Sequence, residues 1–425
     1  MQTLQQLQSG ELKKVTKLKL SEQLSTFPEE IFSLADTLEY LDLSGNNLTE
    51  LPADFGLLKK LKVFFCSNNN FTQLPEVLAD CPLLDIVGFK SNQIETVSAR
   101  SINPNLRWLI LTNNKIVSIP STIGNCSRMQ KLMLAGNKLT TLPEELQECR
   151  NLGLLRISAN LLSSLPEWLL DMPKLSWLAF SGNPFVKAPT IAPLDLINWD
   201  DLQLNNILGQ GASGVIYHAE RATGSLIGEV AVKIFKGDVT SDGLPQDEMN
   251  TCITVGLHPG LPKLLGQINQ HPENKKGLVM ALIPPTFFNL GGPPSLDSCT
   301  RDVFSEDIKL KPEQALKIAA TVASVAAQLH SKNIMHGDLY AHNILIDQEC
   351  NTLLSDFGAA SFYDIPSLEK LEVRAFGYLL EDLIGLCDSK DSNSTHSKLI
   401  EIRETCLQHT ANLRPTFKAI VEQLN

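Results

Sequence analysis

The chain of 425 residues has no long hydrophobic run, because nowhere do about 18 apolar residues follow one another, as a membrane-spanning helix requires. Residues 1–11 lack the basic start and apolar core of a signal peptide. The nine cysteines are scattered and contain no CxxC pair of the kind that binds metals. These absences argue against a membrane-spanning receptor and a disulfide-rich secreted protein. We therefore expect a soluble protein in a reducing cytoplasm.

The chain has fewer basic than acidic residues, and this imbalance is confined to its second half. Residues 1–190 hold 18 Lys+Arg and 18 Asp+Glu, whereas residues 191–425 hold 18 and 29. The formal net charge of −11 therefore arises entirely in the second half. Because an acidic domain repels a phosphate backbone, we expect no nucleic-acid partner.

An internal repeat fills the first half of the chain. The phrase LxxLxLxxNxLxxLP returns at steps of 22 or 23 residues. One slot holds asparagine in every complete copy: Asn46, Asn69, Asn92, Asn114, Asn137, Asn160 and Asn183. A buried amide in this slot can satisfy backbone groups in the turn between adjacent coils. A degenerate copy from Val15 has Glu22 in the asparagine slot and is expected to cap the array.

This pattern resembles the leucine-rich repeat family over about eight copies in residues 12–189. The resemblance implies a horseshoe whose leucines face the core and whose intervening strand residues face the concave side. The candidate partner-binding residues on that side are Tyr40, Phe65, Trp108, Ile110, Met133, Arg156 and Trp177. Because much of this face is apolar, we expect a protein partner or substrate there. Docking of the second half of the chain on this face, or no role at all, are the alternatives.

Residues 190–199 are predicted to link the two halves. Pro189 and Pro193 stiffen this connector, so it is not a flexible tether. A second domain over 200–425 follows, because a chain with 43% hydrophobic residues and this length exceeds one ordinary core.

A glycine-rich segment opens the second domain. Its GxGxxG pattern lies between two β-like runs, and its residues are Gly209, Gln210, Gly211, Ala212, Ser213 and Gly214. Glycines allow backbone amides to approach phosphate oxygens closely, so these residues are candidate nucleotide ligands. By itself the pattern is weak, and a glycine hairpin without a ligand is the alternative.

A lysine in a predicted strand follows the glycine-rich segment. Lys233 lies nineteen residues after Gly214, in a stretch where apolar and other residues alternate. It is a candidate clamp for the α- and β-phosphates of a nucleotide. We expect its partner to be a carboxylate on the next helix, with Glu248 preferred over Asp247.

The strongest pattern is the run His-Gly-Asp-Leu-Tyr-Ala-His-Asn over residues 336–343, followed thirteen residues later by Asp-Phe-Gly at 356–358. With the glycine-rich segment, Lys233 and a late Arg414-Pro415, this order resembles the eukaryotic-type protein kinase family from about residue 200 onward. We therefore expect a multidomain α/β and α+β protein, in which a leucine-rich repeat horseshoe precedes a two-lobed kinase fold.

The kinase resemblance implies ATP as the nucleotide and a role for each conserved motif. Asp338 would orient the substrate hydroxyl and accept its proton, and Lys233 would hold the phosphates. Asn343 and Asp356 would bind Mg²⁺, with Mn²⁺ as an alternative. The expected adenine-pocket residues are Ile216, Ala231, Leu345, the gatekeeper Met280 and the hinge residues Ala281 and Ile283.

The sequence departs from the family in its switch region. Gly337 replaces the usual arginine, and only about sixteen residues separate Asp356 from Glu372. Control by phosphorylation of an activation loop is therefore not expected. Because the Ala-Pro-Glu triplet is absent, Arg414 is expected to pair with Glu369 or Glu372.

The protein substrate class is less sharply indicated. Tyr340 stands where serine/threonine kinases have lysine, and His342 stands where tyrosine kinases often have arginine. A serine/threonine kinase is the favoured interpretation, and a tyrosine or dual-specificity kinase is the alternative. An active enzyme is favoured over a pseudokinase that serves as a scaffold. The reason is that the four residues with a direct part in phosphoryl transfer are present, namely Lys233, Asp338, Asn343 and Asp356.

Overall fold

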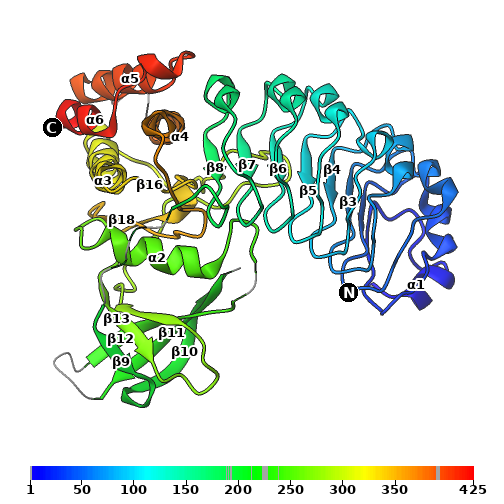
Figure 1. Ribbon diagram of the computed structural model, residues 1–425, viewed down its shortest axis with the longest axis horizontal. Coiled ribbons are helices and arrows are strands. Elements are labelled where there is room, and N and C mark those ends of the chain that lie inside the picture. Colours follow the sequence, from blue (N-terminus) through cyan, green and yellow to red (C-terminus); the bar gives the residue numbers. More distant parts are fainter. Residues whose placement is uncertain are drawn as a thin grey trace. The chain divides into compact units, whose positions relative to one another are not determined.

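The computed structural model describes residues 2–187, 189, 191, 194–211, 213–222, 228–237, 239–388 and 393–425 (Figure 1). The chain divides into two compact units. The first contains Met1–Leu175 and Asn183–Phe185, and the second contains Ser176–Gly182 and Val186–Asn425. The short segment 176–182 carries the sequence of the last repeat, and its strand β8 (Trp177–Ala179) is the eighth strand of the repeat sheet, but the segment belongs to the second compact unit.

The first unit is a stack of short parallel strands, each followed by a 3₁₀ helix, as the repeat predicts. Neighbouring strands pair in register from β1 to β7. The strands are β1 (Lys17–Lys19), β2 (Tyr40–Asp42), β3 (Val63–Phe65), β4 (Ile86–Gly88), β5 (Trp108–Ile110), β6 (Lys131–Met133) and β7 (Leu154–Arg156). The 3₁₀ helices are η1 (Glu29–Leu34), η2 (Ala53–Leu57), η3 (Glu76–Asp80), η4 (Ala99–Ser101), η5 (Ser121–Asn125), η6 (Glu144–Glu148) and η7 (Glu167–Asp171).

The predicted asparagine ladder runs through the turns of this stack. Asn137 is a representative member: its Nδ2 donates to the carbonyls of Leu111 and Leu134, and its Oδ1 accepts from the amide of Ile116. One amide therefore satisfies backbone groups of two adjacent coils, which are buried from water once the coils stack. The central strand residues, such as Leu132, are completely buried between sheet and 3₁₀ helices.

A second ladder, which the sequence analysis missed, runs on the 3₁₀ side. The Sγ of Cys126 lies 3.5 Å from the carbonyl oxygen of Asn103, and the Sγ of Cys149 lies 3.2 Å from that of Ile123. Burial raises the pKa of both thiols to about 12. These cysteines are buried donors to the preceding coil, which explains their 23-residue spacing.

The first coil is closed by helix α1 (Leu4–Gln8). Thr3 caps this helix, because its side chain accepts from the amide of Gln6. The carboxylate of Glu22 accepts from the amide of Leu4 at the same helix N-terminus. Glu22, which replaces asparagine in the repeat pattern, thus accepts a hydrogen bond from the first turn of α1, as expected of a residue in the predicted cap.

The second unit contains a six-stranded mixed sheet in the order β10-β11-β12-β14-β13-β9. Its strands are β9 (Leu196–Asn198), β10 (Leu202–Gln210), β11 (Gly214–Arg221), β12 (Gly228–Phe235), β13 (Leu264–Asn269) and β14 (Gly277–Ala281). Strand β9 lies in the stretch predicted as a linker and pairs in parallel with β13. It joins the sheet because Ile197 is buried against Ile268. Of the linker residues, Thr190, Ala192 and Pro193 lie outside the described residues.

Helices and short strands complete the second unit. The helices are α2 (Pro245–Val255), α3 (Pro312–Ser331), α4 (Glu369–Gly385), α5 (Ser394–Cys406) and α6 (Phe417–Leu424), with 3₁₀ turns η8 (Trp199–Asp201), η9 (Ala341–Asn343), η10 (Pro366–Leu368) and η12 (Ala411–Leu413). The remaining strands are β8 (Trp177–Ala179), β15 (Phe288–Asn289), β16 (Ile334–Met335), β17 (Ile344–Ile346), β18 (Thr352–Leu354) and β19 (Ser361–Phe362). Helix α3 buries an apolar stripe at helical spacing, so it forms the centre of this helical part.

The prediction that Arg414 pairs with Glu369 or Glu372 was wrong. The buried guanidinium of Arg414 donates instead to three backbone carbonyls, those of Lys370, Gln408 and His409. Its geometry suits these carbonyls, because a guanidinium presents several N–H donors in one plane. Glu372 is instead bound at the amides of His336 and Gly337.

Among the helices of the described residues, none has both the length and the hydrophobicity that crossing a membrane requires.

Candidate active site

The glycine-rich segment forms the hairpin between β10 and β11. A Cβ at Gly214 would lie 2.6 Å from the carbonyl oxygen of Ile234 on β12, so this position requires glycine for packing. A Cβ at Gly209 or Gly211 would meet no atom within 4 Å. The open side of these two glycines leaves room for a ligand. Gln210 and Ser213 lie in the same hairpin, whereas Ala212 is outside the described residues.

Lys233 on β12 and Glu248 on α2 form a direct ion pair. Both side chains are largely buried. Burial by itself lowers the pKa of Lys233, but the carboxylates of Glu248 and Asp356 outweigh it and raise the pKa above its usual value. Lys233 is therefore a fixed cation within the site. Helix α2 begins with Pro245 at its first turn and presents Glu248, rather than Asp247, to the lysine.

Three of the predicted adenine-pocket residues lie on adjoining strands of the six-stranded sheet. In the six-stranded sheet, Ala231 of β12 is paired with Met280 of β14, and Ile216 of β11 is paired with Lys233. Leu345 lies on β17, paired with Asn289 of β15. The structure thus places Ile216, Ala231 and Met280 in one sheet and Leu345 in a separate one.

The two hinge residues differ in their backbone bonding. The Ala281 amide donates to the carbonyl of Lys263 at 2.9 Å. In the described part of the chain, no group accepts a hydrogen bond from the Ile283 amide. Of the two predicted hinge amides, that of Ile283 is therefore the one without an acceptor among the described residues.

Asp338 and Asn343 are held together in the loop between β16 and β17. The Nδ2 of Asn343 donates to both the backbone carbonyl and the Oδ2 of Asp338, each at 2.8 Å. Because its nitrogen is engaged in this way, the amide oxygen of Asn343 is left as a ligand atom. The buried 3₁₀ turn η9 fixes the asparagine on the loop.

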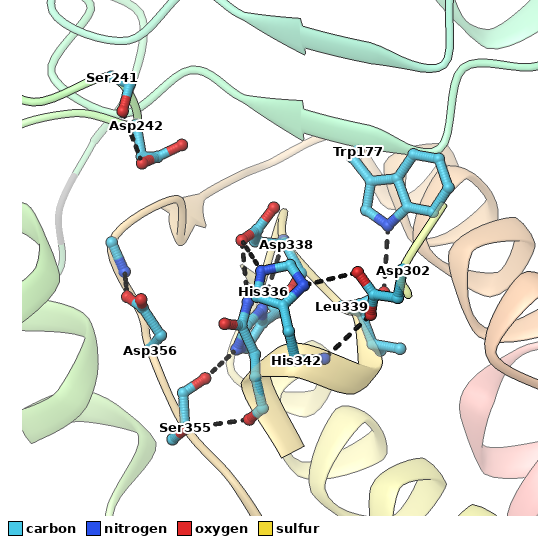
Figure 2. A network of polar contacts seen from close by, with 12 residues as sticks. Trp177, Ser241, Asp242, Asp302, His336, Asp338, Leu339, His342, Ser355 and Asp356 are labelled. Carbon is cyan, nitrogen blue, oxygen red and sulfur yellow. Dashed lines mark hydrogen bonds and ion pairs between the residues drawn. The ribbon is translucent and has the colours of Figure 1, made fainter. Parts of the chain in front are cut away.

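Asp356 has an uncommon backbone conformation. Its φ angle is +56°, in the left-handed region that a non-glycine residue adopts at some cost. Its Oδ1 accepts from the amide of Gly358, which stabilises the turn (Figure 2). The carboxylate also contributes to the raised pKa of Lys233, so the two groups share one electrostatic environment.

Glu372 of α4 supports the backbone ahead of Asp338. Its two carboxylate oxygens accept from the amides of His336 and Gly337 at 3.0 and 2.7 Å, and Nε2 of His330 lies 2.7 Å from Oε2. Burial raises the pKa of Glu372, but the hydrogen bond and charge of His330 and the contacts of the loop outweigh burial and lower it. Glu372 is therefore a charged anchor for the loop.

His342 lies between two carboxylates, as Figure 2 shows. Its Nδ1 is 2.7 Å from Oδ1 of Asp302, and its Nε2 is 3.9 Å from Oδ2 of Asp338. Burial lowers the pKa of His342, but Asp302, Asp338 and Asp356 together raise it above the usual value. The sequence analysis missed Asp302, because it lies forty residues from His342 and in no recognisable motif.

The expected concave-face residues divide into two groups. Tyr40, Phe65, Trp108, Ile110 and Met133 are partly exposed in the first unit, whereas Arg156 and Trp177 are buried. Two partly exposed rings touch edge-on, those of Tyr40 and Phe65, at 5.8 Å between centroids. Trp177 belongs to the second unit, where its indole Nε1 donates to the carbonyl of Leu339.

Comparison with known families agrees with this architecture. The protein kinase domain profile matches residues 202–385. Leucine-rich repeat profiles match residues 36–101, 104–162 and 128–185. The chain therefore contains leucine-rich repeats followed by a protein kinase domain.

Individual relatives match only parts of the chain. The rust resistance kinase Lr10 of Triticum aestivum is 32% identical over 163 residues, which cover 36% of this chain and 23% of the relative. "Probable serine/threonine-protein kinase gdt4" of Dictyostelium discoideum is 29% identical over 167 residues, 38% of this chain and 9% of the relative. The tyrosine-protein kinase receptor TYRO3 of Gallus gallus is 27% identical over 167 residues, 38% of this chain and 19% of the relative. This chain thus spans less than a quarter of the length of each relative.

Proposed function

We propose that this chain is an active protein kinase that transfers the γ-phosphoryl group of ATP to a protein hydroxyl. The Lys233–Glu248 ion pair carries this proposal, because it joins the sheet that holds the glycine hairpin to α2. The lysine is thereby poised for nucleotide phosphates, and Asp338 and Asn343 are already joined in the catalytic loop.

In the proposed reaction, a bond forms between the substrate hydroxyl oxygen and the γ-phosphorus. The bond from that phosphorus to the β–γ bridging oxygen breaks, and ADP leaves. The hydroxyl proton passes to the carboxylate of Asp338. Lys233 holds the α- and β-phosphates, and the glycine hairpin covers them with its backbone amides.

The site offers a donor set that fits Mg²⁺. The carboxylate of Asp356 and the free amide oxygen of Asn343 are hard oxygen ligands, and Mg²⁺ commonly takes one or two protein ligands together with phosphate oxygens and water. When bound, such an ion would neutralise phosphate charge. Mn²⁺ would accept the same ligands.

Serine and threonine are the proposed acceptors. The name of the Dictyostelium relative supports this choice, while the match to a tyrosine kinase receptor keeps tyrosine as the alternative. The catalytic loop has neither of the expected cations, since Tyr340 and His342 occupy those positions. Phosphoamino-acid analysis of the reaction product distinguishes the two classes.

Incubation of the purified chain with labelled ATP, Mg²⁺ and a generic protein substrate tests the activity. We expect incorporation of label that falls by at least about a hundredfold in Lys233→Met, which removes the phosphate clamp, and in Asp338→Asn, which removes the acceptor of the hydroxyl proton. Equal labelling in all three proteins would reveal a contaminating kinase. Nucleotide binding without transfer would contradict the proposal and favour a pseudokinase scaffold.

For the repeats, we infer a protein-binding role of the partly exposed residues Tyr40, Phe65, Trp108, Ile110 and Met133. Their partial exposure and apolar character support this role. Affinity capture from a lysate, with the wild type and with Phe65→Glu/Trp108→Glu, tests this binding surface. Residence in the cytoplasm is a separate prediction. A set of captured proteins unchanged by the double substitution would contradict the inferred surface.

A further inference from the structure

Strand β8 (Trp177–Ala179) makes contacts that its repeat sequence does not predict. In the second unit, the indole of Trp177 stacks on the ring of Tyr340 with 4.3 Å between centroids and 9° between planes. Its Nε1 donates to the carbonyl of Leu339 at 3.1 Å. Trp177 therefore holds the two residues that directly follow Asp338, as Figure 2 shows for Leu339.

The residue before Asp338 is also shaped by this strand. Gly337 has a φ angle of +73°, and a Cβ there would lie 2.7 Å from the carbonyl oxygen of Leu178 and 2.6 Å from that of Ala359. Only glycine fits so close an approach of two backbones in this conformation. The backbone of β8 thus occupies the space that a side chain at residue 337 would need.

A third contact reaches the segment after Asp-Phe-Gly. The amide of Phe180 donates to Oγ of Ser361 at 3.1 Å, and Ser361 belongs to β19, which pairs with β16 directly ahead of the catalytic loop. Trp177 and Ser361 are both buried. Residues 177–180 therefore contact both sides of Asp338 and the strand that frames it.

We propose that β8 positions the catalytic loop, with Trp177 as the positioning residue that aligns Asp338. This inference rests on the proposed kinase activity for its rate consequence. The physical basis is that a catalytic carboxylate acts efficiently only when its loop is held within a fraction of an ångström, and the stacked indole restricts the loop at residues 339 and 340. Trp177 acts through the loop, because it contacts Leu339 and Tyr340, the two residues that follow Asp338.

Steady-state kinetics of three variants test the role of Trp177. In Trp177→Ala, we expect kcat to fall about tenfold or more while the KM for ATP stays within about twofold, because the loop loses its alignment but the nucleotide site is intact. Trp177→Phe keeps a stacking ring without the indole donor and should recover part of the rate. Trp168→Ala, in η7 of the first unit, is the matched tryptophan control and should keep the wild-type kcat.

Hydrogen–deuterium exchange over residues 336–343 provides a readout that does not depend on activity. We expect faster exchange in Trp177→Ala and wild-type exchange in Trp168→Ala. Unchanged exchange and kcat in Trp177→Ala, or a higher kcat, would overturn the positioning role. An inactive wild type would contradict the proposed function, whereas the exchange comparison would still decide the role of β8. If Trp177→Ala does not fold, Trp177→Phe decides it by the same two measurements.

Discussion

At the scale of single residues, the charge around Asp338 is the most informative feature. By the family resemblance, Tyr340 and His342 stand where kinases have lysine or arginine. The structure places His342 beside Asp302 and Asp338, and these carboxylates raise its pKa against the effect of burial. An imidazolium at this place would supply positive charge beside Asp338, the proposed acceptor of the hydroxyl proton.

We predict that His342→Gln lowers kcat on the order of tenfold, because glutamine cannot carry the positive charge that His342 can place beside the proposed site of transfer. His342→Arg keeps a cation and should retain more of the rate than glutamine does. Steady-state assays at saturating ATP measure both variants. Equal rates for glutamine, arginine and the wild type would show that this charge has no part in transfer.

At the scale of elements, the repeats are held by side-chain ladders as much as by their short strands. A three-residue strand offers few backbone bonds, so each asparagine binds two neighbouring coils. The cysteines near the 3₁₀ helices form a similar series on the other side of the stack. The loss of the Asn137 rung leaves one buried amide without an acceptor and removes one of two amide donors from each of two carbonyls.

For Asn137→Ala, we expect the free energy of unfolding of the repeats to fall by about 2–4 kcal/mol. The Ile116 amide loses its acceptor, and the carbonyls of Leu111 and Leu134 each lose one of two side-chain amide donors. Asn125→Ala, at an exposed position of η5, should change it by less than about 0.5 kcal/mol. Urea denaturation followed by circular dichroism measures both. A similar loss in the two variants would contradict the ladder as the source of stability.

At the scale of the whole molecule, the boundary between the compact units does not follow the repeat pattern. Ser176–Gly182 continues the repeat in sequence yet belongs to the second unit, where Trp177 contacts Leu339 and Tyr340. The boundaries 12–189, 190–199 and 200–425 remain predictions based on sequence patterns. Segment 176–182 and strand β9 suggest that a fragment of the second unit needs residues before 200.

A comparison of two fragments tests this suggestion. We predict that fragment 176–425 melts at a higher temperature than fragment 183–425, because removal of a buried tryptophan typically costs about 3–5 kcal/mol. The full chain serves as the reference in the same thermal denaturation assay. Equal melting temperatures of the two fragments would show that segment 176–182 adds no stability to the second unit.

Local patterns in the chain were enough to predict the repeats, the asparagine ladder and the set of kinase motifs. Each of these depends on residue types at short, fixed spacings, where periodicity and backbone geometry decide the outcome. The prediction that Glu248 rather than Asp247 pairs with Lys233 also depended on local pattern, and it was confirmed. Adjacent residues of a helix point in different directions, so only one of the two carboxylates reaches the lysine.

Contacts between distant segments could not be predicted in this way. The bonding of Arg414 to carbonyls, the Asp302–His342 pair and the stacking of Trp177 on Tyr340 join residues whose spacing carries no signal. The repeat pattern assigned Trp177 to an open surface, because alternation tells only which side of a strand a residue faces. What covers that side depends on which other surfaces pack there, and tertiary structure alone decides this.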